Sequence, residues 1–359
     1  MRVGVLTGGG DCPGLNAVIR AVSKSLMLNC GASVVGFEDG FLGLIERRSR
    51  DLSYRDVSGI LAQGGTILGT NNKANPLKYH ERGGADVTDE CVAYYNELKL
   101  DGLVVIGGDG TMSIAHAMQQ KGMNIVGVPK TIDNDLMATD RTFGFDTAVS
   151  IATEAIDRLQ TTGQSHQRVM ILETMGRYTG WIALEAGIAG GADIILIPEI
   201  PYELDHIVEM VKSRENRQRF TIIVIAEGAA PKHGSMTVRE TIDSSPDPIR
   251  LGGVGNVLRQ QLEELVDSEI RTTVLGHVQR GGTPTASDRI LSTRYGAHAA
   301  ELVRLGQFDR MVALQNGKLT SVGLNEVANK TRKVPIDDPL LSAAAAVGTS
   351  FGINLGDHK

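Results

Sequence analysis

The chain opens with Met1-Arg-Val-Gly-Val-Leu-Thr-Gly-Gly-Gly-Asp-Cys-Pro-Gly-Leu-Asn16, a short apolar run that ends in three glycines and an aspartate. Residues 3–6 are apolar at consecutive positions, the pattern of a strand that is buried on both faces. The stretch that follows, 16–27, has the spacing of a helix. Strand, glycine turn and helix in this order indicate an α/β fold with a parallel sheet.

The same unit recurs along the chain. Further strands are predicted where apolar runs end in glycine, proline or an acidic residue, at 103–106, 125–128, 169–172, 194–197, 222–226 and 273–275. Helix-like stretches lie between them at 113–120, 148–160 and 256–264. Because ligands collect at the carboxyl ends of parallel strands, the glycine and acidic clusters after these runs are candidate binding residues.

Length and composition limit the class of protein. A chain of 359 residues that is 42% hydrophobic can bury a sizeable core, which excludes a disordered protein. The net charge of −6 argues against a protein that coats nucleic acid. We find no signal peptide and no apolar run of about 18 residues that could cross a bilayer. Three cysteines are too few for a disulfide scaffold, so we expect a soluble cytoplasmic protein that binds neither nucleic acid nor membranes.

Two glycine-rich turns are candidate phosphate sites. The turn 8–11 precedes a predicted helix, whose first N–H groups could bind a polyanion, although a tight turn that merely needs small residues is equally consistent. The turn 107–111 places Asp109 among glycines. A carboxylate there would repel phosphate unless a divalent cation lay between them, which favours Mg²⁺ over the alternative that Asp109 caps the next helix.

A third loop, Pro129-Lys130-Thr131-Ile132-Asp133-Asn134-Asp135, follows the predicted strand 125–128. Two acids two residues apart at a sheet edge suit proton abstraction from a hydroxyl, whereas an Asx-turn that closes the loop is the structural alternative.

Four arginines lie near the ends of predicted strands, and guanidinium groups are favoured where phosphate must be gripped. They are Arg168, Arg177, Arg271 and Arg280. A single arginine is more often solvated or paired, but four among glycines favour a phosphate site. His277 could be a core histidine, and Glu227 could bind sugar hydroxyls or pair with an arginine.

Taken together and in this order, the motifs resemble those of the 6-phosphofructokinases, the bacterial enzymes that use ATP or pyrophosphate. The matching stretches are 8–20, 64–69, 107–111, 129–135, 165–180, 227–228 and 274–282. The resemblance implies two doubly wound parallel-sheet domains with the active site in the cleft between them. The donor domain would comprise 1–140 and about 253–305, and the sugar-phosphate domain 141–252 and about 306–359, with a C-terminal extension.

The resemblance also implies a reaction, phosphoryl transfer to the 1-hydroxyl of fructose 6-phosphate in glycolysis, and a role for each matching residue. Asp133 would take the proton, with Thr131, Asp135 and Arg177 assisting transfer, and Asp109 would hold Mg²⁺. The donor would be bound by Gly10, Lys73, Gly108, Asp109, Gly110, Thr111 and Lys130. The sugar phosphate would be bound by Thr131, Ile132, Asp133, Arg168, Met175, Gly176, Arg177, Glu227, Arg271, His277 and Arg280. Arg168 and Arg271 would reach a neighbouring subunit's site, which implies a homo-oligomer, with a tetramer as the first expectation.

The donor residues carry a mixed signature. Pyrophosphate users of this family carry Asp where this chain has Gly110 and Lys where it has Lys130, whereas typical bacterial ATP users carry Gly at both. A carboxylate at position 110 would crowd the α-phosphate of ATP, so Gly110 favours ATP, and pyrophosphate is the alternative. Lys73 stands near an expected Arg, and Gln63 and Lys24 replace basic effector residues, which makes the family's effector control doubtful.

Two other functions compete with this one. The Gly-Gly-Asp-Gly-Thr motif also occurs in NAD and lipid kinases, but those would not explain 175–177 and 277–280. A non-catalytic subunit that senses sugar phosphate is the alternative outside the enzymes. The sequence leaves open whether sedoheptulose 7-phosphate is preferred, which effectors bind, whether a dimer or tetramer forms, and what the C-terminal extension does.

Overall fold

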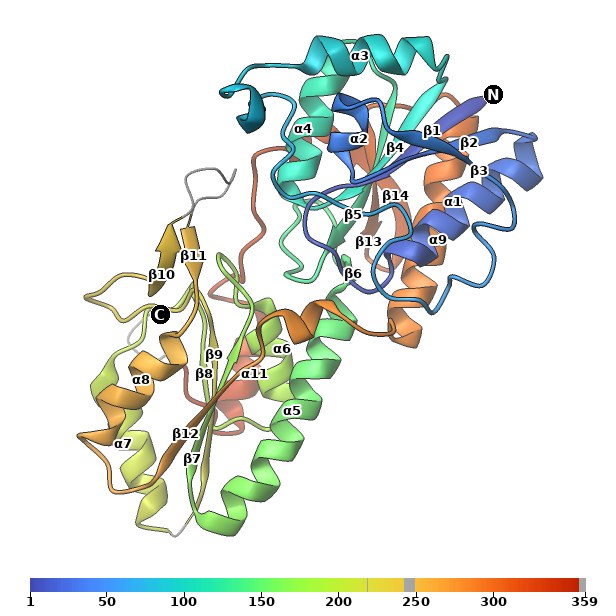
Figure 1. Ribbon diagram of the computed structural model, residues 1–359. Coiled ribbons are helices and arrows are strands. Elements are labelled where there is room, and N and C mark those ends of the chain that lie inside the picture. Colours follow the sequence, from blue (N-terminus) through green and yellow to red (C-terminus); the bar gives the residue numbers. More distant parts are fainter. Residues whose placement is uncertain (218, 242–248, 355–359) are drawn as a thin grey trace. The chain divides into compact units, whose positions relative to one another are not determined.

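The computed structural model describes residues 1–217, 219–241 and 249–354. The chain divides into two compact units, which are described separately (Figure 1). Of the described residues, unit 1 comprises 1–147 and 280–331, and unit 2 comprises 148–217, 219–241, 249–279 and 332–354. In the described residues, the longest helices are too polar to span a lipid bilayer.

Unit 1 contains an eight-stranded sheet in the order β14-β13-β5-β4-β1-β2-β3, with the short β6 beside β5. The strands are β1 (Arg2–Thr7), β2 (Ser33–Phe37), β3 (Ser49–Leu52), β4 (Gly102–Gly107), β5 (Ile125–Thr131), β6 (Phe143–Gly144), β13 (Arg310–Gln315) and β14 (Lys318–Gly323). All pairs are parallel except β2 with β3 and β13 with β14, which place antiparallel strands at the two edges. The central strands are buried on both faces, as their uninterrupted apolar sequence predicts.

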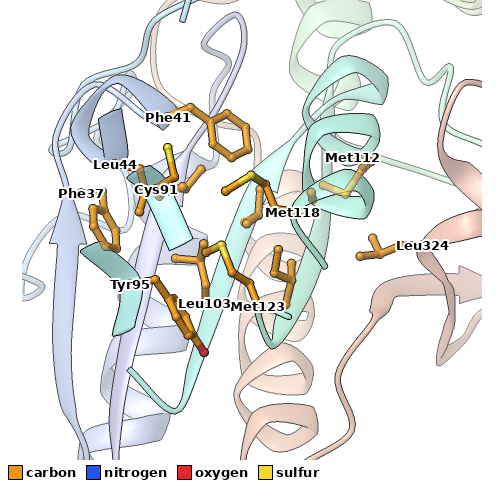
Figure 2. Close-up of a cluster of buried hydrophobic side chains, with 14 of the residues drawn as sticks. Phe37, Phe41, Leu44, Cys91, Tyr95, Leu103, Met112, Met118, Met123 and Leu324 are labelled. Carbon is orange, nitrogen blue, oxygen red and sulfur yellow. The ribbon is translucent and has the colours of Figure 1, made fainter. Parts of the chain in front are cut away.

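Helices cover both faces of this sheet. On one face the core is formed by side chains of the sheet, such as Leu103, together with Phe41, Cys91 and Met118 from the covering helices (Figure 2). Those helices are α2 (Phe41–Ile45), α3 (Thr88–Glu97), α4 (Asp109–Gln120) and α10 (Leu324–Val327), and a short 3₁₀ helix, η1 (His80–Arg82), precedes α3. On the other face lie α1 (Leu15–Cys30) and α9 (Ala286–Arg304), which pack closely because Gly296 has no side chain: a Cβ there would lie 2.7 Å from Ala21 Cβ.

Unit 2 contains a four-stranded, fully parallel sheet in the order β12-β7-β9-β8 and a separate hairpin, β10-β11. The strands are β7 (Val169–Thr174), β8 (Ile194–Leu196), β9 (Thr221–Ala226), β10 (Val238–Thr241), β11 (Ile249–Leu251) and β12 (Ile270–Val274). Side chains of α7 (Leu204–Glu215) and α8 (Val254–Glu263) form the core against one face of the sheet. On the other face α6 (Trp181–Ala189) packs on Ile195 through Gly187. The long α5 (Phe145–His166) leads into β7 (Figure 1).

The last described part of the C-terminal extension, residues 332–354, belongs to unit 2. After α11 (Pro339–Ala346), Ser350 lies alongside edge strand β8 and accepts a hydrogen bond from the N–H of Ile195 at 2.9 Å. Phe351 next to it is fully buried. The segment therefore adds one more backbone pairing to the sheet, on the side of β8 that β9 leaves open.

The predicted α/β fold with parallel sheets is confirmed, and every predicted strand and helix is present. Among the described residues, the predicted domain boundaries differ from the division into units at three places, the shortest being residues 141–147, which belong to unit 1. Residues 253–279 belong to unit 2, because β12 pairs with β7, and residues 306–331 belong to unit 1, because β13 pairs with β5.

Candidate active site

The loops that follow β1, β4 and β5 line one pocket in unit 1, of about 320 Å³. The three strands are neighbours in a parallel sheet, so their carboxyl ends meet at the same edge. The pocket, called the unit 1 pocket below, is lined by Gly9, Gly10, Phe41, Asn71, Asn72, Ala74, Asn75, Gly108, Asp109, Gly110, Thr111, Ile114, Lys130, Thr131, Asp133, Asp135 and Arg280. Ten of the predicted residues thus meet in one place: Gly10, Gly108, Asp109, Gly110, Thr111, Lys130, Thr131, Asp133, Asp135 and Arg280.

Side chains hold the first glycine loop by three consecutive carbonyl groups. Thr70 Oγ1 donates to Gly9 O at 2.5 Å, Lys130 Nζ donates to Gly10 O, and Arg280 Nη1 donates to Asp11 O at 3.2 Å. Among the described residues, none accepts a hydrogen bond from the N–H groups of Gly9 or Gly10. With its carbonyls bonded, the loop has N–H groups left for an anionic ligand.

Gly10 is required for this arrangement. A Cβ at position 10 would lie 2.9 Å from Arg280 Nη1, so any side chain would displace the guanidinium. Cys12 in the same loop is fully buried, and burial raises its pKa to about 12, so the thiol is not a nucleophile at neutral pH.

Three carboxylates line the pocket, those of Asp109, Asp133 and Asp135. Asp109 is exposed at the start of α4, where its Oδ1 accepts the N–H of Gly110 at 2.7 Å. Burial, followed by repulsion from Asp133 and Asp109, raises the pKa of Asp135 to about 8. The Asp135 Oδ1 atom is buried and has no hydrogen-bond partner among the described residues. This excess of negative charge and unused acceptor capacity fits a divalent cation, and Mg²⁺ needs only one or two protein carboxylates beside phosphate oxygens.

Thr131, Asn134 and Thr142 make hydrogen bonds that close the loop after β5. Thr131 Oγ1 accepts the N–H of Asp133 at 3.0 Å, and Asn134 Oδ1 accepts the N–H of Thr142 at 3.0 Å. Thr142 Oγ1 donates to Thr131 O at 2.8 Å.

Lys130 and Gly110, the two residues of the mixed donor signature, have contrasting surroundings in the pocket. Lys130 is buried, its ammonium donates to the glycine loop, and burial lowers its pKa. At Gly110 a Cβ would meet nothing within 4 Å, so glycine leaves this part of the pocket open.

Lys73 does not line the pocket, although the sequence predicts a donor contact there. Asn71 Oδ1 accepts the N–H of Lys73 at 2.7 Å and of Ala74 at 3.0 Å, forming an Asx-turn that leaves Lys73 exposed. The pocket is lined instead by Asn71, Asn72 and Asn75, which our sequence analysis missed. The Asn-Asn pair after the 64–69 glycine stretch was the available signal.

A second pocket, of about 460 Å³, lies in unit 2 at the carboxyl ends of β7, β9 and β12. This unit 2 pocket is lined by Glu173, Thr174, Met175, Glu227, Leu251, Gly252, Gly253, Asn256, Val274, Gly276 and His277. Three predicted sugar-phosphate residues are among them: Met175, Glu227 and His277. Its described lining contains two carboxylates and no lysine or arginine, which suits hydroxyl groups better than a phosphate.

Gly176 and Arg177 lie beside this pocket without lining it. Gly176 has φ +133, and a Cβ at Gly228 would lie 1.8 Å from Arg177 O. These two glycines bring the loops after β7 and β9 into backbone contact. The Arg177 guanidinium lies over the ring of Tyr178, 5.6 Å from its centroid.

Of the four predicted arginines, Arg168, Arg177 and Arg271 belong to unit 2 and Arg280 belongs to unit 1. Arg168 precedes β7 and Arg271 is the second residue of β12, so both lie at the amino edge of the sheet, where both pair with Glu269. A six-residue strand separates this edge from Met175 by roughly 20 Å. Arg280 lines the unit 1 pocket. Ile132 is fully buried and lines neither pocket.

Comparisons with known proteins agree with this arrangement. The model of the family described as phosphofructokinase matches residues 2–303. The protein named ATP-dependent 6-phosphofructokinase 2 of Clostridium perfringens is 53% identical over 358 residues, which are 98% of each chain. The pyrophosphate–fructose 6-phosphate 1-phosphotransferase of Amycolatopsis methanolica is 50% identical over 335 residues, 93% of this chain and 96% of the other. The crystal structure of Pichia pastoris phosphofructokinase matches with a TM-score of 0.78 and 29% identity; the match covers 97% of this chain but only 36% of that one.

Proposed function

Because the chain belongs to the phosphofructokinase family, we propose that it is an ATP-dependent 6-phosphofructokinase, which converts fructose 6-phosphate into fructose 1,6-bisphosphate in glycolysis. One observation carries the proposal: Asp109, Asp133 and Asp135 line the same pocket as Gly9 and Gly10, whose N–H groups have no acceptor among the described residues. Backbone N–H groups and a cation suit the donor phosphates, and a second carboxylate suits the hydroxyl that attacks them.

In this proposal Asp133 is the base that takes the proton from the 1-hydroxyl. Asp109 holds Mg²⁺, which when bound would neutralise charge on the donor phosphates. Thr131 holds the backbone of Asp133 in place. Burial and repulsion raise the pKa of Asp135 to about 8, so Asp135 holds a proton at neutral pH and adds no second full negative charge beside the base. The transition state of phosphoryl transfer is loose, so these residues act mainly by positioning and by electrostatics.

The role of Asp133 is tested by Asp133→Ser. We expect turnover to fall by a factor on the order of 10³ or more, while the affinity for fructose 6-phosphate stays within a few fold. Isothermal titration with the sugar phosphate and a coupled rate assay give the two quantities. Asp337→Ser, a change at an exposed aspartate of unit 2, is the control that should alter neither. Near-normal turnover in Asp133→Ser would remove Asp133 from this role.

The choice of ATP as donor rests on Gly110. The glycine leaves the pocket open beside Asp109, where a carboxylate would repel the α-phosphate of ATP. Lys130, the other half of the mixed signature, is bonded to the glycine loop and excludes no donor. Sequence identity does not decide the donor, since relatives with either name are about equally similar.

A matrix of two donors and two acceptors tests the function. Purified protein is assayed with ATP or pyrophosphate against fructose 6-phosphate or sedoheptulose 7-phosphate. Turnover of ATP with fructose 6-phosphate at the highest kcat/KM supports the proposal. Turnover with pyrophosphate alone would overturn the donor, and binding of fructose 6-phosphate without turnover with any donor would support the sugar-phosphate sensor instead.

We propose further that the enzyme is a homo-oligomer, with a tetramer as the first expectation. In this assembly Arg168 and Arg271 serve a neighbouring subunit's site. Both lie at the edge of their sheet opposite their own pocket, whose described lining has no cationic side chain to neutralise a phosphate. A cytoplasmic location is proposed because all three cysteines are free thiols, as expected in a reducing compartment.

A further inference from the structure

The unit 2 pocket has in its wall a buried carboxylate to which the proposed reaction gives no role. Glu173 is the second-last residue of β7, and only 2% of its surface is exposed. Its Oε1 accepts the N–H of Gly253 at 2.9 Å, and its Oε2 accepts the N–H of Gly255 at 2.8 Å. Both oxygens are therefore already bonded to the backbone at the start of α8.

Helix α8 has no cap of its own. Its N-cap residue is Gly253, which has no side chain, and its first turn contains no acidic residue. The first N–H groups of a helix have no partner within the helix, and its amino end favours a negative charge. Glu173, on strand β7, supplies the acceptors for these N–H groups and the negative charge. These contacts explain how a carboxylate that has no ion pair among the described residues can be buried there.

The contact also depends on glycines. A Cβ at Gly255 would lie 3.2 Å from Glu173 Oε2, so a side chain would press on the carboxylate. Gly252 and Gly253 have φ values of +134 and +88, in the region that glycine tolerates. Because glycine restrains its backbone little, this segment needs an external anchor to keep one shape.

We propose that Glu173 is a positioning residue for the acceptor sugar. By holding the first turn of α8, it sets the wall of the unit 2 pocket formed by Gly252, Gly253 and Asn256, which line the pocket together with Glu227 and His277. It acts through α8, because each of its oxygens is already bonded to a backbone N–H group at the start of that helix. The inference rests on the proposed function, because it assigns the acceptor to this pocket.

The test is Glu173→Gln in the full-length enzyme. The amide has one oxygen, so one of the two backbone N–H groups loses its acceptor and faces an NH₂ group instead. We expect the KM for fructose 6-phosphate to rise roughly tenfold, the loss of one such hydrogen bond, while the KM for the donor stays within about twofold. Should Glu173→Gln not fold, Glu173→Asp keeps the charge but shortens its reach, and a smaller rise in the same KM is expected.

Glu199→Gln is the matched control. Glu199 is a carboxylate of the same unit that also accepts from two backbone N–H groups, those of Gly180 and Val334, and it lies outside the pocket lining. It should lower the melting temperature as Glu173→Gln does and leave the KM for fructose 6-phosphate unchanged.

The outcomes separate the inference from the function. A rise in the acceptor KM confined to the Glu173 variants supports the inference. Equal values in wild type and Glu173→Gln, or an equal rise in Glu199→Gln, would show that Glu173 only stabilises the fold, with the proposed function intact. A wild-type protein that neither binds nor phosphorylates fructose 6-phosphate would refute the function, and the inference with it.

Discussion

At the scale of single residues, position relative to strand direction decides which predictions the structure supports. Asp109, Asp133 and Asp135 each follow a buried strand, and the carboxyl ends of those parallel strands share an edge, so the sequence could predict that they meet. Arg168 and Arg271 also flank strands but lie at the amino ends. Nearness to a strand in the sequence does not distinguish its amino end from its carboxyl end. A prediction based on nearness alone therefore groups Arg168 and Arg271 with side chains that lie at the carboxyl ends of strands.

Burial of Asp135 predicts a pH dependence of stability. Its pKa is about 8 in the folded protein and about 4 when unfolded, so between these values the folded state holds a proton that the unfolded state does not. Stability is then lost as the pH rises, by up to about 1.4 kcal/mol per pH unit. Urea unfolding without metal or nucleotide, from pH 5 to 8, should show this slope in wild type and its loss in Asp135→Asn. Parallel curves for the two proteins would contradict the assignment.

The hydrogen bond of Thr70 to the glycine loop predicts that its loss weakens donor binding without weakening acceptor binding. Thr70→Val keeps the shape of the side chain but removes the hydrogen bond to Gly9 O, so the glycine loop loses one of its three supports. We expect the KM for ATP to rise about three- to tenfold, equivalent to about 1 kcal/mol, with the KM for fructose 6-phosphate unchanged. Thr349→Val removes a similar bond, to Ala192 O in unit 2, and should leave both constants as they are. A donor KM that is the same in all three proteins would contradict the role of Thr70.

At the scale of elements, local pattern predicted the strands and helices better than their pairing. Uninterrupted apolar runs predicted the central strands, because a strand covered on both faces needs no polar side. The hairpin β13-β14 was missed although its turn, Asn316-Gly317, has positive φ at both residues and is a strong hairpin signal. That β13 joins β5 depends on contacts between segments far apart in the chain, which local sequence does not encode.

The C-terminal segment predicts a large loss of stability when Phe351, which lines neither pocket, is replaced. Phe351 is fully buried beside the backbone pairing of Ser350 with β8, so Phe351→Ala leaves a cavity in unit 2. We expect the free energy of unfolding to fall by about 3–5 kcal/mol. Val347→Ala, at a side chain that is 83% exposed, should cost less than about 0.5 kcal/mol. Equal stability of the two variants, measured by urea unfolding, would mean that the segment is not part of the core.

At the scale of the whole molecule, the two pockets described above belong to different units, and the charges of their linings differ. The unit 1 pocket combines backbone N–H groups, Lys130 and Arg280 with three acids, whereas the described lining of the unit 2 pocket has two glutamates and no lysine or arginine. A sugar phosphate needs cations as well as acceptors for its hydroxyl groups. The sequence could not reveal this imbalance, because it depends on which edge of the sheet each arginine occupies.

The imbalance leads to a prediction for the assembled enzyme. If Arg168 and Arg271 serve a neighbouring subunit, a site combines Asp133 of one chain with arginines of another. Arg271→Ala and Asp133→Ser should each be nearly inactive as pure proteins, the first through a raised KM for fructose 6-phosphate. Mixed, unfolded and refolded together in equal amounts, they should regain roughly a quarter of wild-type activity, since half of the randomly formed pairs are mixed and each mixed pair has one complete site. Refolding each variant alone is the control. Activity that stays at the level of the separate variants, in a mixture that forms oligomers normally, would place all the catalytic residues of a site in one chain.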